Sequence, residues 1–500
     1  IQIYLTILLD KITDYNSSFC TWHASGEKLR NVFPRPAIPI IFDFAEANPF
    51  SGKSGSISNA IHYIVAALKK LPRNSKATVM LKDAKEEFAD RDLMISTDPP
   101  YYDNIIYSDI SDYFYIWEKY ILRNIYKRFF KTILTPKKEE IVMKKEQNDR
   151  NNNKNINFFE KSLLKVFLNI NNISSQNIPI TIYYAFKQNI MKKIVTENGV
   201  EIEIGSTGWE TMLAALIKAG FSISGTWPMR TELSNRPRSQ KSNALSTSVV
   251  LVCRKRPHNA PVLTTHDFLK TLDNELKTSV KYLQKANILP VDLGQAAIGP
   301  GMAVYSRYSR IVGSDGSAMT VNKALVEINR ALERYLSETE LDLDAESLFC
   351  LRLYAQYAYN FIPYGDAEVI ARGPNTSIDT IADLKVLSKV HGKVRLLERR
   401  EMDSSRLHDR GCVWQVMQLM VKAMQVDGIT GCAKIYNGIT PGEAEQARNL
   451  IYRIYAIADR NRWSEEAVAY NDVIASWRQI QAKASELSGP PPEHVGPLFR

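Results

Sequence analysis

The feature that most constrains this chain is an apolar run that ends in an acidic residue and two prolines. Leu93-Met94-Ile95-Ser96-Thr97 has the composition of a buried strand, and Asp98-Pro99-Pro100-Tyr101 follows it directly. Two successive prolines fix φ and remove two backbone donors, so the strand must end there. The sequence therefore predicts a rigid loop that presents Asp98 at the end of a strand.

This loop carries hydrogen-bond acceptors and an aromatic ring in a fixed order. The Asp98 carboxylate and the Pro99 carbonyl can both accept hydrogens from an exocyclic amino group, which localises the nitrogen lone pair for attack on a methyl donor. Pro100 shapes the turn, and Tyr101 offers a ring on which a base taken out of a duplex can stack. An ordinary proline-rich turn at a strand end is the alternative interpretation.

Composition sets the broad class of protein. The chain has 500 residues, of which 45% are hydrophobic and 24% charged, as expected for two to four globular domains. Its net charge of +10 favours a polyanionic partner, although a solvated basic loop would also supply part of that excess. No run reaches the roughly 18 apolar residues that a membrane span needs. The five cysteines form no C-x-x-C pair, so we expect reduced thiols in a cytoplasm and no zinc ribbon within these residues.

The first half of the chain alternates predicted strands and helices, which indicates an open, largely parallel α/β sheet with its site at the carboxyl ends of the strands. We assign residues 1–256 to this catalytic domain, with a low-complexity insertion near residues 136–158. The predicted strands are Pro39–Phe42, Ala77–Leu81, Leu93–Thr97, Pro179–Phe186, Phe221–Trp227 and Thr247–Cys253.

Residues 257–500 are predicted to be mainly helical, with long amphipathic runs at Asn322–Leu336 and Glu443–Asn461. Within them, residues 347–400 read as three short helices followed by a strand, which is how a winged helix-turn-helix begins, and we expect this segment to recognise DNA. The predicted helices are Ser347–Tyr359, Gly365–Arg372 and Ser377–Leu384, and the predicted strand is Lys393–Leu397. A plain segment of a helical bundle is the alternative.

The sequence around the loop resembles the large prokaryotic adenine-specific DNA methylases that carry a Zn-ribbon. The similarity starts at Thr97-Asp98-Pro99-Pro100-Tyr101-Tyr102-Asp103-Asn104-Ile105 and extends over most of the chain. Further blocks that carry it are Phe42-Asp43-Phe44-Ala45-Glu46-Ala47-Asn48-Pro49-Phe50, Thr181–Gln188, Gly208-Trp209-Glu210-Thr211, Thr226–Glu232 and Gly299–Tyr308.

The resemblance implies a Rossmann-like methyltransferase sheet, incomplete at its N-terminal side. It also implies transfer of a methyl group from S-adenosyl-L-methionine to the amino group of adenine in double-stranded DNA, with the base flipped and no metal required. The resemblance also implies a role in restriction-modification or in defence against phage, together with partner proteins of such a system. Methylation of cytosine amino groups or of RNA, and an inactive DNA-binding fragment, are the alternative functions.

The resemblance also suggests roles for residues outside the loop. Asp83, Asp43 and Glu46 are candidates for contacting the cofactor, although capping of a helix or bracing of a loop would explain each of them as well. Candidates for contacting DNA or the base follow the loop or later strands, with solvated surface charge as the alternative for the basic ones. These candidates are Tyr102, Asp103, Asn104, Lys187, Arg230, Asn235 and Arg236.

One expected motif is missing. Methylases of this kind hold the cofactor on a glycine-rich turn between a strand and a helix, and no such turn lies between Ile1 and Asp98. We expect it upstream of Ile1, which would leave this chain incomplete as an enzyme. The alternative is a circular permutation that uses Gly299-Pro300-Gly301, the nearest similar string.

Overall fold

The computed structural model describes residues 1–35, 37–72, 76–100, 105–142, 156–184, 191–196, 199–204, 207–230, 247–403 and 411–488. The chain divides into two compact units, one of Ile1–Arg91 with Pro100–Ile173 and one of Asp92–Pro99 with Ser174–Arg500. The division does not coincide with the predicted boundary near residue 256, because the sheet strands after Ser174 pack with the helices that follow them. In the described part of the chain, no helix is long and apolar enough to cross a membrane.

The first unit is mainly helical. A small core of Cys20, Leu29 and Val32 joins the segment after its first helix to a two-stranded antiparallel hairpin. Ser56 caps the second helix by accepting a hydrogen bond from the Asn59 amide. Its elements are α1 (Gln2–Thr13), β1 (Thr21–His23), η1 (Ala24–Gly26), β2 (Lys28–Arg30), α2 (Ile57–Lys70), α3 (Tyr107–Leu122) and α4 (Ile156–Ile173).

The predicted insertion near residues 136–158 is ordered at both ends. Lys137 lies 2.6 Å from the Asp112 carboxylate of α3, and the Glu140 carboxylate accepts hydrogen bonds from the backbone and hydroxyl of Ser108. At the other end, residues 156–158 belong to α4. Composition alone does not predict order at the first end, because its anchoring bonds are made to a helix about 30 residues earlier in the chain.

Two strands predicted for the first unit are wrong. Pro39–Phe42 and Ala77–Leu81 are irregular, and their large side chains are exposed, with Val79 at 94%. A strand needs a partner for its backbone groups, and no described segment pairs with either of these runs. The β-propensity of these residues is therefore not enough to form a strand.

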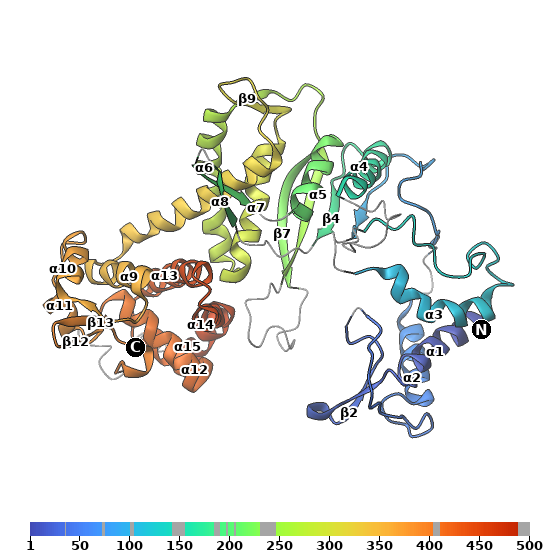
Figure 1. Cartoon of the computed structure of the whole chain (residues 1–500), viewed down its shortest axis with the longest axis horizontal. Coiled ribbons are helices and arrows are strands. Elements are labelled where there is room, and N and C mark those ends of the chain that lie inside the picture. Colours follow the sequence, from blue (N-terminus) through green and yellow to red (C-terminus); the bar gives the residue numbers. More distant parts are fainter. Residues whose placement is uncertain are drawn as a thin grey trace, which may run out of the picture. The chain divides into compact units, whose positions relative to one another are not determined.

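The second unit is built on a four-stranded sheet of β3 (Ser96–Thr97), β4 (Ile180–Tyr184), β8 (Thr247–Lys255) and β7 (Phe221–Arg230), in that order. Figure 1 labels β4 and β7 of this sheet. β3 and β4 are parallel, and β8 is antiparallel to both β4 and β7. Three strands therefore share one direction and β8 runs against them. The sheet is mixed α/β as predicted, but only one of its three hydrogen-bonded pairs is parallel.

Helices α5 (Thr207–Lys218) and α7 (Pro290–Ser306) pack on β7, and α6 (Thr265–Lys285) and α8 (Val321–Glu338) pack on α7. A β-bulge between Ile223 and Gly225 shifts the register of β7 against β8. The buried Ser306 hydroxyl at the end of α7 accepts a hydrogen bond from the Ile223 amide at 2.8 Å. Two short pairs complete this part, β5 (Met191–Thr196) with β6 (Gly199–Ile204) and β9 (Val262–Thr264) with β10 (Arg310–Val312).

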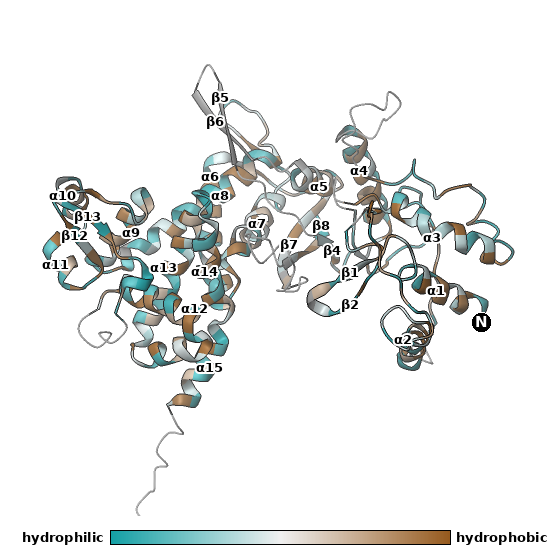
Figure 2. Cartoon of the chain, turned by 60° about the horizontal axis from the view of Figure 1, so that its bottom comes forward, coloured by the Kyte–Doolittle hydropathy of each residue, from teal (hydrophilic) through white to brown (hydrophobic). Residues whose placement is uncertain are grey.

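The C-terminal part begins with three helices and a three-stranded antiparallel sheet, followed by four helices that carry both hydrophilic (teal) and hydrophobic (brown) residues (Figure 2). The predicted helices within residues 347–384 and the strand at 393–397 are present within one residue or two of the expected bounds. The elements are η2 (Thr339–Asp342), α9 (Ala345–Tyr357), β11 (Ile362–Pro363), α10 (Tyr364–Arg372), α11 (Ile378–Asp383), β12 (Leu387–Val390), β13 (Lys393–Leu396), η3 (Arg399–Glu401), α12 (Val413–Asn437), α13 (Pro441–Arg460), α14 (Ser464–Ala475) and α15 (Trp477–Leu487).

Candidate functional site

The strand that leads into the Asp-Pro-Pro loop is held by the neighbouring strand β4. The Thr181 amide donates to the Ile95 carbonyl at 3.0 Å, and the Thr181 hydroxyl donates to that of Ser96 at 3.0 Å. Thr97 is paired with Ile182 in parallel register. The residues before Asp98 are thus fixed in the sheet, as the sequence predicts, although the regular strand covers only Ser96 and Thr97.

The loop places its first residues in different environments. Asp98 is exposed, Pro99 is buried and Pro100 is half-buried. The Asp98 carboxylate makes no hydrogen bond or ion pair to the part of the chain that the structure describes. A buried proline with an exposed carboxylate before it is a suitable arrangement for an acceptor that must meet a ligand. Tyr101, Tyr102, Asp103 and Asn104 lie outside the described residues.

The directions of the strands bring several predicted segments to one edge of the sheet. Because β3, β4 and β7 share a direction, their carboxyl ends lie at the same edge of the sheet. The antiparallel strand β8 starts at that edge. Asp98 follows β3 at this edge, and Arg230 is the last residue of β7. Lys187, Asn235 and Arg236 lie outside the described residues, in segments that begin where β4 and β7 end.

Aromatic side chains lie near the carboxyl ends of β4 and β7. Tyr184, the last residue of β4, is fully buried and stacks on Trp209 of α5, with ring centroids 5.4 Å apart and an interplanar angle of 22°. Trp227, near the carboxyl end of β7, is 57% exposed. An exposed indole at this edge offers a face on which a base can stack. Sequence reasoning noted Trp227 only as part of a resemblance, and the period-2 alternation of β7 does not distinguish an exposed face from a buried one.

The three residues predicted to contact the cofactor belong to the first unit. Asp43 and Glu46 are exposed on an irregular segment, whose Ala45 amide donates to the Cys20 carbonyl at 2.9 Å. Asp83 accepts a hydrogen bond from the Lys85 amide at 2.9 Å and pairs with the Lys85 ammonium at 3.4 Å. Asp83 therefore braces a turn, and it does not follow a strand as predicted.

The string Gly299-Pro300-Gly301 lies inside helix α7 and does not form a turn. A Cβ on Gly299 would stand 1.9 Å from the hydroxyl oxygen of Thr226 in β7, and a Cβ on Gly301 would stand 2.5 Å from Ile328 of α8. The two glycines thus allow close packing of α7 against its neighbours, and the space beside them is filled. The described residues do not form a glycine-rich cradle for S-adenosyl-L-methionine, and the permuted alternative is wrong.

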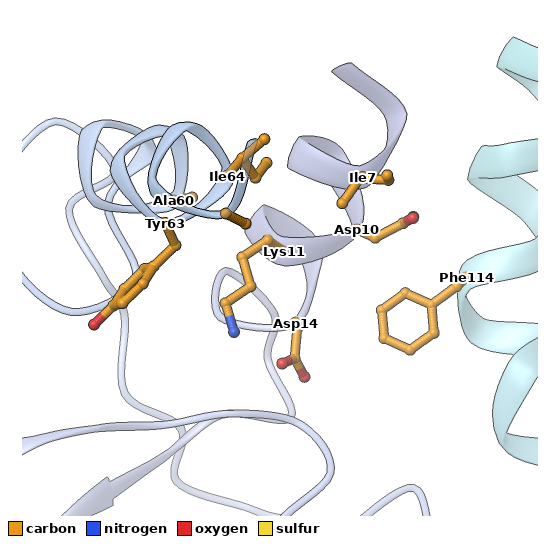
Figure 3. Close-up of a pocket in the computed structure, with 9 residues that line it drawn as sticks. Ile7, Asp10, Lys11, Asp14, Ala60, Tyr63, Ile64 and Phe114 are labelled. Atoms are coloured by element: carbon orange, nitrogen blue, oxygen red, sulfur yellow. The ribbon is translucent and has the colours of Figure 1, made fainter. Parts of the chain in front are cut away.

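The first unit has a separate groove of about 390 Å³ between α1, α2 and α3 (Figure 3). Ile7, Ile64 and Phe114 give it apolar walls, and Asp10 of α1 and Asp14, which follows that helix, add carboxylates. Burial, together with the neighbouring Glu118 carboxylate, raises the pKa of Asp10 to about 7. None of the residues that the sequence predicts for the site lines this groove.

No disulfide forms among the five cysteines, all of which are buried. Within the described ranges, no group of three or more His, Cys, Asp and Glu side chains is placed to hold a metal ion.

The fold is that of a mixed α/β protein with a helical C-terminal part. Residues 344–495 match the family model for a domain of unknown function, DUF8807. The match begins at Asp344, whose side chain caps α9, and extends beyond α15. No curated protein and no solved structure matches the chain.

Proposed function

We propose that this chain is the base-binding and DNA-binding part of a DNA methyltransferase that acts on the exocyclic amino group of adenine. The observation that carries the proposal is the exposed Asp98 carboxylate, followed by a buried Pro99, at the carboxyl end of a sheet strand. Ligand sites of open α/β sheets lie at this end of the strands. We take the mixed sheet of the second unit as part of a Rossmann-like methyltransferase sheet.

The proposed chemistry concerns the amino group of the base. Its nitrogen is a weak nucleophile because its lone pair is delocalised into the ring. The Asp98 carboxylate and the Pro99 carbonyl accept hydrogen bonds from its two N–H groups, so that electron density is localised on the nitrogen. The prolines hold both acceptors in place before reaction, which reduces the reorganisation that the transition state requires.

The methyl donor implied by the resemblance is S-adenosyl-L-methionine, and the described residues do not fit it, because the glycines that would approach it are packed in α7. The same observation favours a second candidate function, a DNA-binding chain that transfers no methyl group.

Two measurements separate these functions. The first is calorimetric titration of the 500-residue chain with S-adenosyl-L-methionine, in which saturable binding at one site supports the methyltransferase. The second incubates chain, cofactor and duplex DNA and quantifies methylated nucleosides after digestion. The methyl group should be found on the adenine amino group, and methylcytosine or methylated RNA alone would overturn the choice of substrate.

Asp98→Ala provides the test of the site. We expect it to lower methyl transfer by at least about 100-fold while DNA binding is retained, because a preorganised acceptor of this kind contributes roughly 3 kcal/mol. Glu368→Ala, which removes an exposed carboxylate of α10, is the matched control and should transfer at the wild-type rate. Near-normal transfer by the Asp98 variant would refute the assignment. Binding of DNA without cofactor binding or transfer by the wild-type chain would favour the second candidate.

A further inference from the structure

We propose that the β12–β13 hairpin contacts the DNA backbone and that the neighbouring helix α11 does not enter the major groove. The inference rests on the proposed function for its choice of DNA as the polyanion. It is carried by the arrangement of the elements between Ala345 and Leu396 and by the distribution of charge over them.

The order of these elements is helix, strand, two helices and a hairpin (Figure 1). β13 lies between β11 and β12 in one antiparallel sheet. Helices α10 and α11, joined by a short turn, occupy the positions of a helix-turn-helix, whose second helix reads the major groove in many DNA-binding proteins. Two surfaces are thus available for DNA, namely α11 and the hairpin.

Charge is divided between these two surfaces. Residues 364–383, which form α10 and α11, carry four acidic side chains and one basic one. Residues 385–395, which include the hairpin, carry four basic side chains and no acidic one. The acidic residues are Asp366, Glu368, Asp379 and Asp383, and the basic ones are Lys385, Lys389, Lys393 and Arg395.

The acidic side disfavours α11 as a groove-reading helix. Asp379 and Asp383 lie on its exposed side, so that insertion into the groove would bring carboxylates toward phosphates. Lys389 compensates part of this charge by its ion pair with Asp379. Asp383 interacts electrostatically with the same lysine, so Lys389 is engaged by both carboxylates of α11.

Two lysines are available for phosphates, one just before β12 and one at the start of β13. Lys385 and Lys393 are exposed, and neither forms an ion pair with any residue that the structure describes. Arg395, by contrast, holds the Glu401 carboxylate through both terminal nitrogens at 2.7 and 2.6 Å. Lysine ammonium groups without protein partners are the groups that release counterions from DNA.

The tip of the hairpin is rigid. His391 and Gly392 form a two-residue turn in which both have positive φ, at 48° and 73°, as in the turns that match the twist of a hairpin. The Gly392 carbonyl accepts a hydrogen bond from the Tyr364 amide at 2.9 Å, which ties the tip to α10. A tip held in this way presents exposed His391 and Lys393 at little cost in entropy.

The test measures binding of the full chain to a labelled DNA duplex by fluorescence anisotropy over a series of salt concentrations. K385Q/K393Q removes the two available lysines. K281Q/K285Q removes two exposed lysines of α6 and is the matched control. We expect the hairpin variant to bind more weakly and the slope of log K against log salt to become shallower by about 2, since each phosphate contact contributes about 0.9. The control variant should keep the wild-type slope.

Other results would overturn the proposal. Equal losses in the hairpin and control variants would show a diffuse effect of net charge, and no loss in either would place the contact elsewhere. A large gain in affinity for D379N/D383N over its parent, measured in a K389Q background so that loss of Asp379 releases no hairpin lysine, would show that α11 faces the DNA. The assay needs neither cofactor nor methyl transfer, so weak binding by the hairpin variant stands even if Asp98 proves to have no catalytic role. Conversely, if the wild-type chain transfers methyl groups and K385Q/K393Q binds DNA as wild type does, the role of the hairpin is refuted and the proposed function is not.

Discussion

Replacement of Gly299 by alanine tests whether the Gly-Pro-Gly string is a packing device. The new Cβ would lie 1.9 Å from Oγ1, 2.1 Å from Cγ2 and 2.4 Å from Cβ of Thr226. Ordinary van der Waals contact begins at 3.4 Å, so the nearest atom would have to withdraw by about 1.5 Å. The Cβ of Thr226 is fixed by the strand, so rotation of its side chain cannot relieve the third overlap, and α7 must move away from β7.

We expect G299A to destabilise the second unit by about 3 kcal/mol or more, at the upper end of the cost of overpacking. Thermal unfolding followed by circular dichroism measures the loss. Because a chain of this size does not unfold in one step, hydrogen exchange of the peptides from α7 and β7 should be used to localise it.

Two controls accompany this variant. G294A lies in the same helix with nothing within 4 Å of its new Cβ, and it should stabilise the protein by roughly 0.5–1 kcal/mol through helix propensity. In a T226G background, G299A should cost much less, because all three overlapping atoms are gone. If G299A were as mild as G294A, α7 would not pack on β7 as described.

Three further changes test local features. A358G should raise the free energy of unfolding by about 1 kcal/mol, because Ala358 ends α9 at φ 52° and ψ −119°, where glycine is favoured; a lower midpoint of thermal unfolding would contradict this. G428A should lower the free energy of unfolding by roughly 1–3 kcal/mol, since Gly428 kinks α12 at φ 61° and ψ −148°, and an unchanged midpoint would mean that α12 can straighten. Burial and Glu118 raise the pKa of Asp10 to about 7 from 3.8, so the folded state retains the proton longer than the unfolded state does. Stability should therefore fall as the pH rises from about 4 to about 7, by on the order of 1 kcal/mol once solvent screening of this half-exposed group is included. D10N should remove that dependence, and a pH profile identical to wild type would refute the role of Asp10.

Much of the local structure could be predicted from the chain alone. Helical periodicity predicted the bounds of α8 and α13 within about two residues. The apolar face of an amphipathic helix is defined by the spacing of apolar residues in its own sequence. The strand ending at Thr97 could be predicted because two prolines forbid its continuation. The position of Asp98 at the end of a strand could therefore be predicted from the sequence.

Other features depended on residues far away in the chain. Ala77–Leu81 has the composition of a strand, but a strand exists only where another segment pairs with it. The glycines of α7 read as a turn until Thr226 and Ile328 are placed against them. The insertion of β8 between β4 and β7 gathers Asp98 and Arg230 at one edge of the sheet. Sequence spacing carries no information on such pairing, because it is decided by contacts between segments that are distant along the chain.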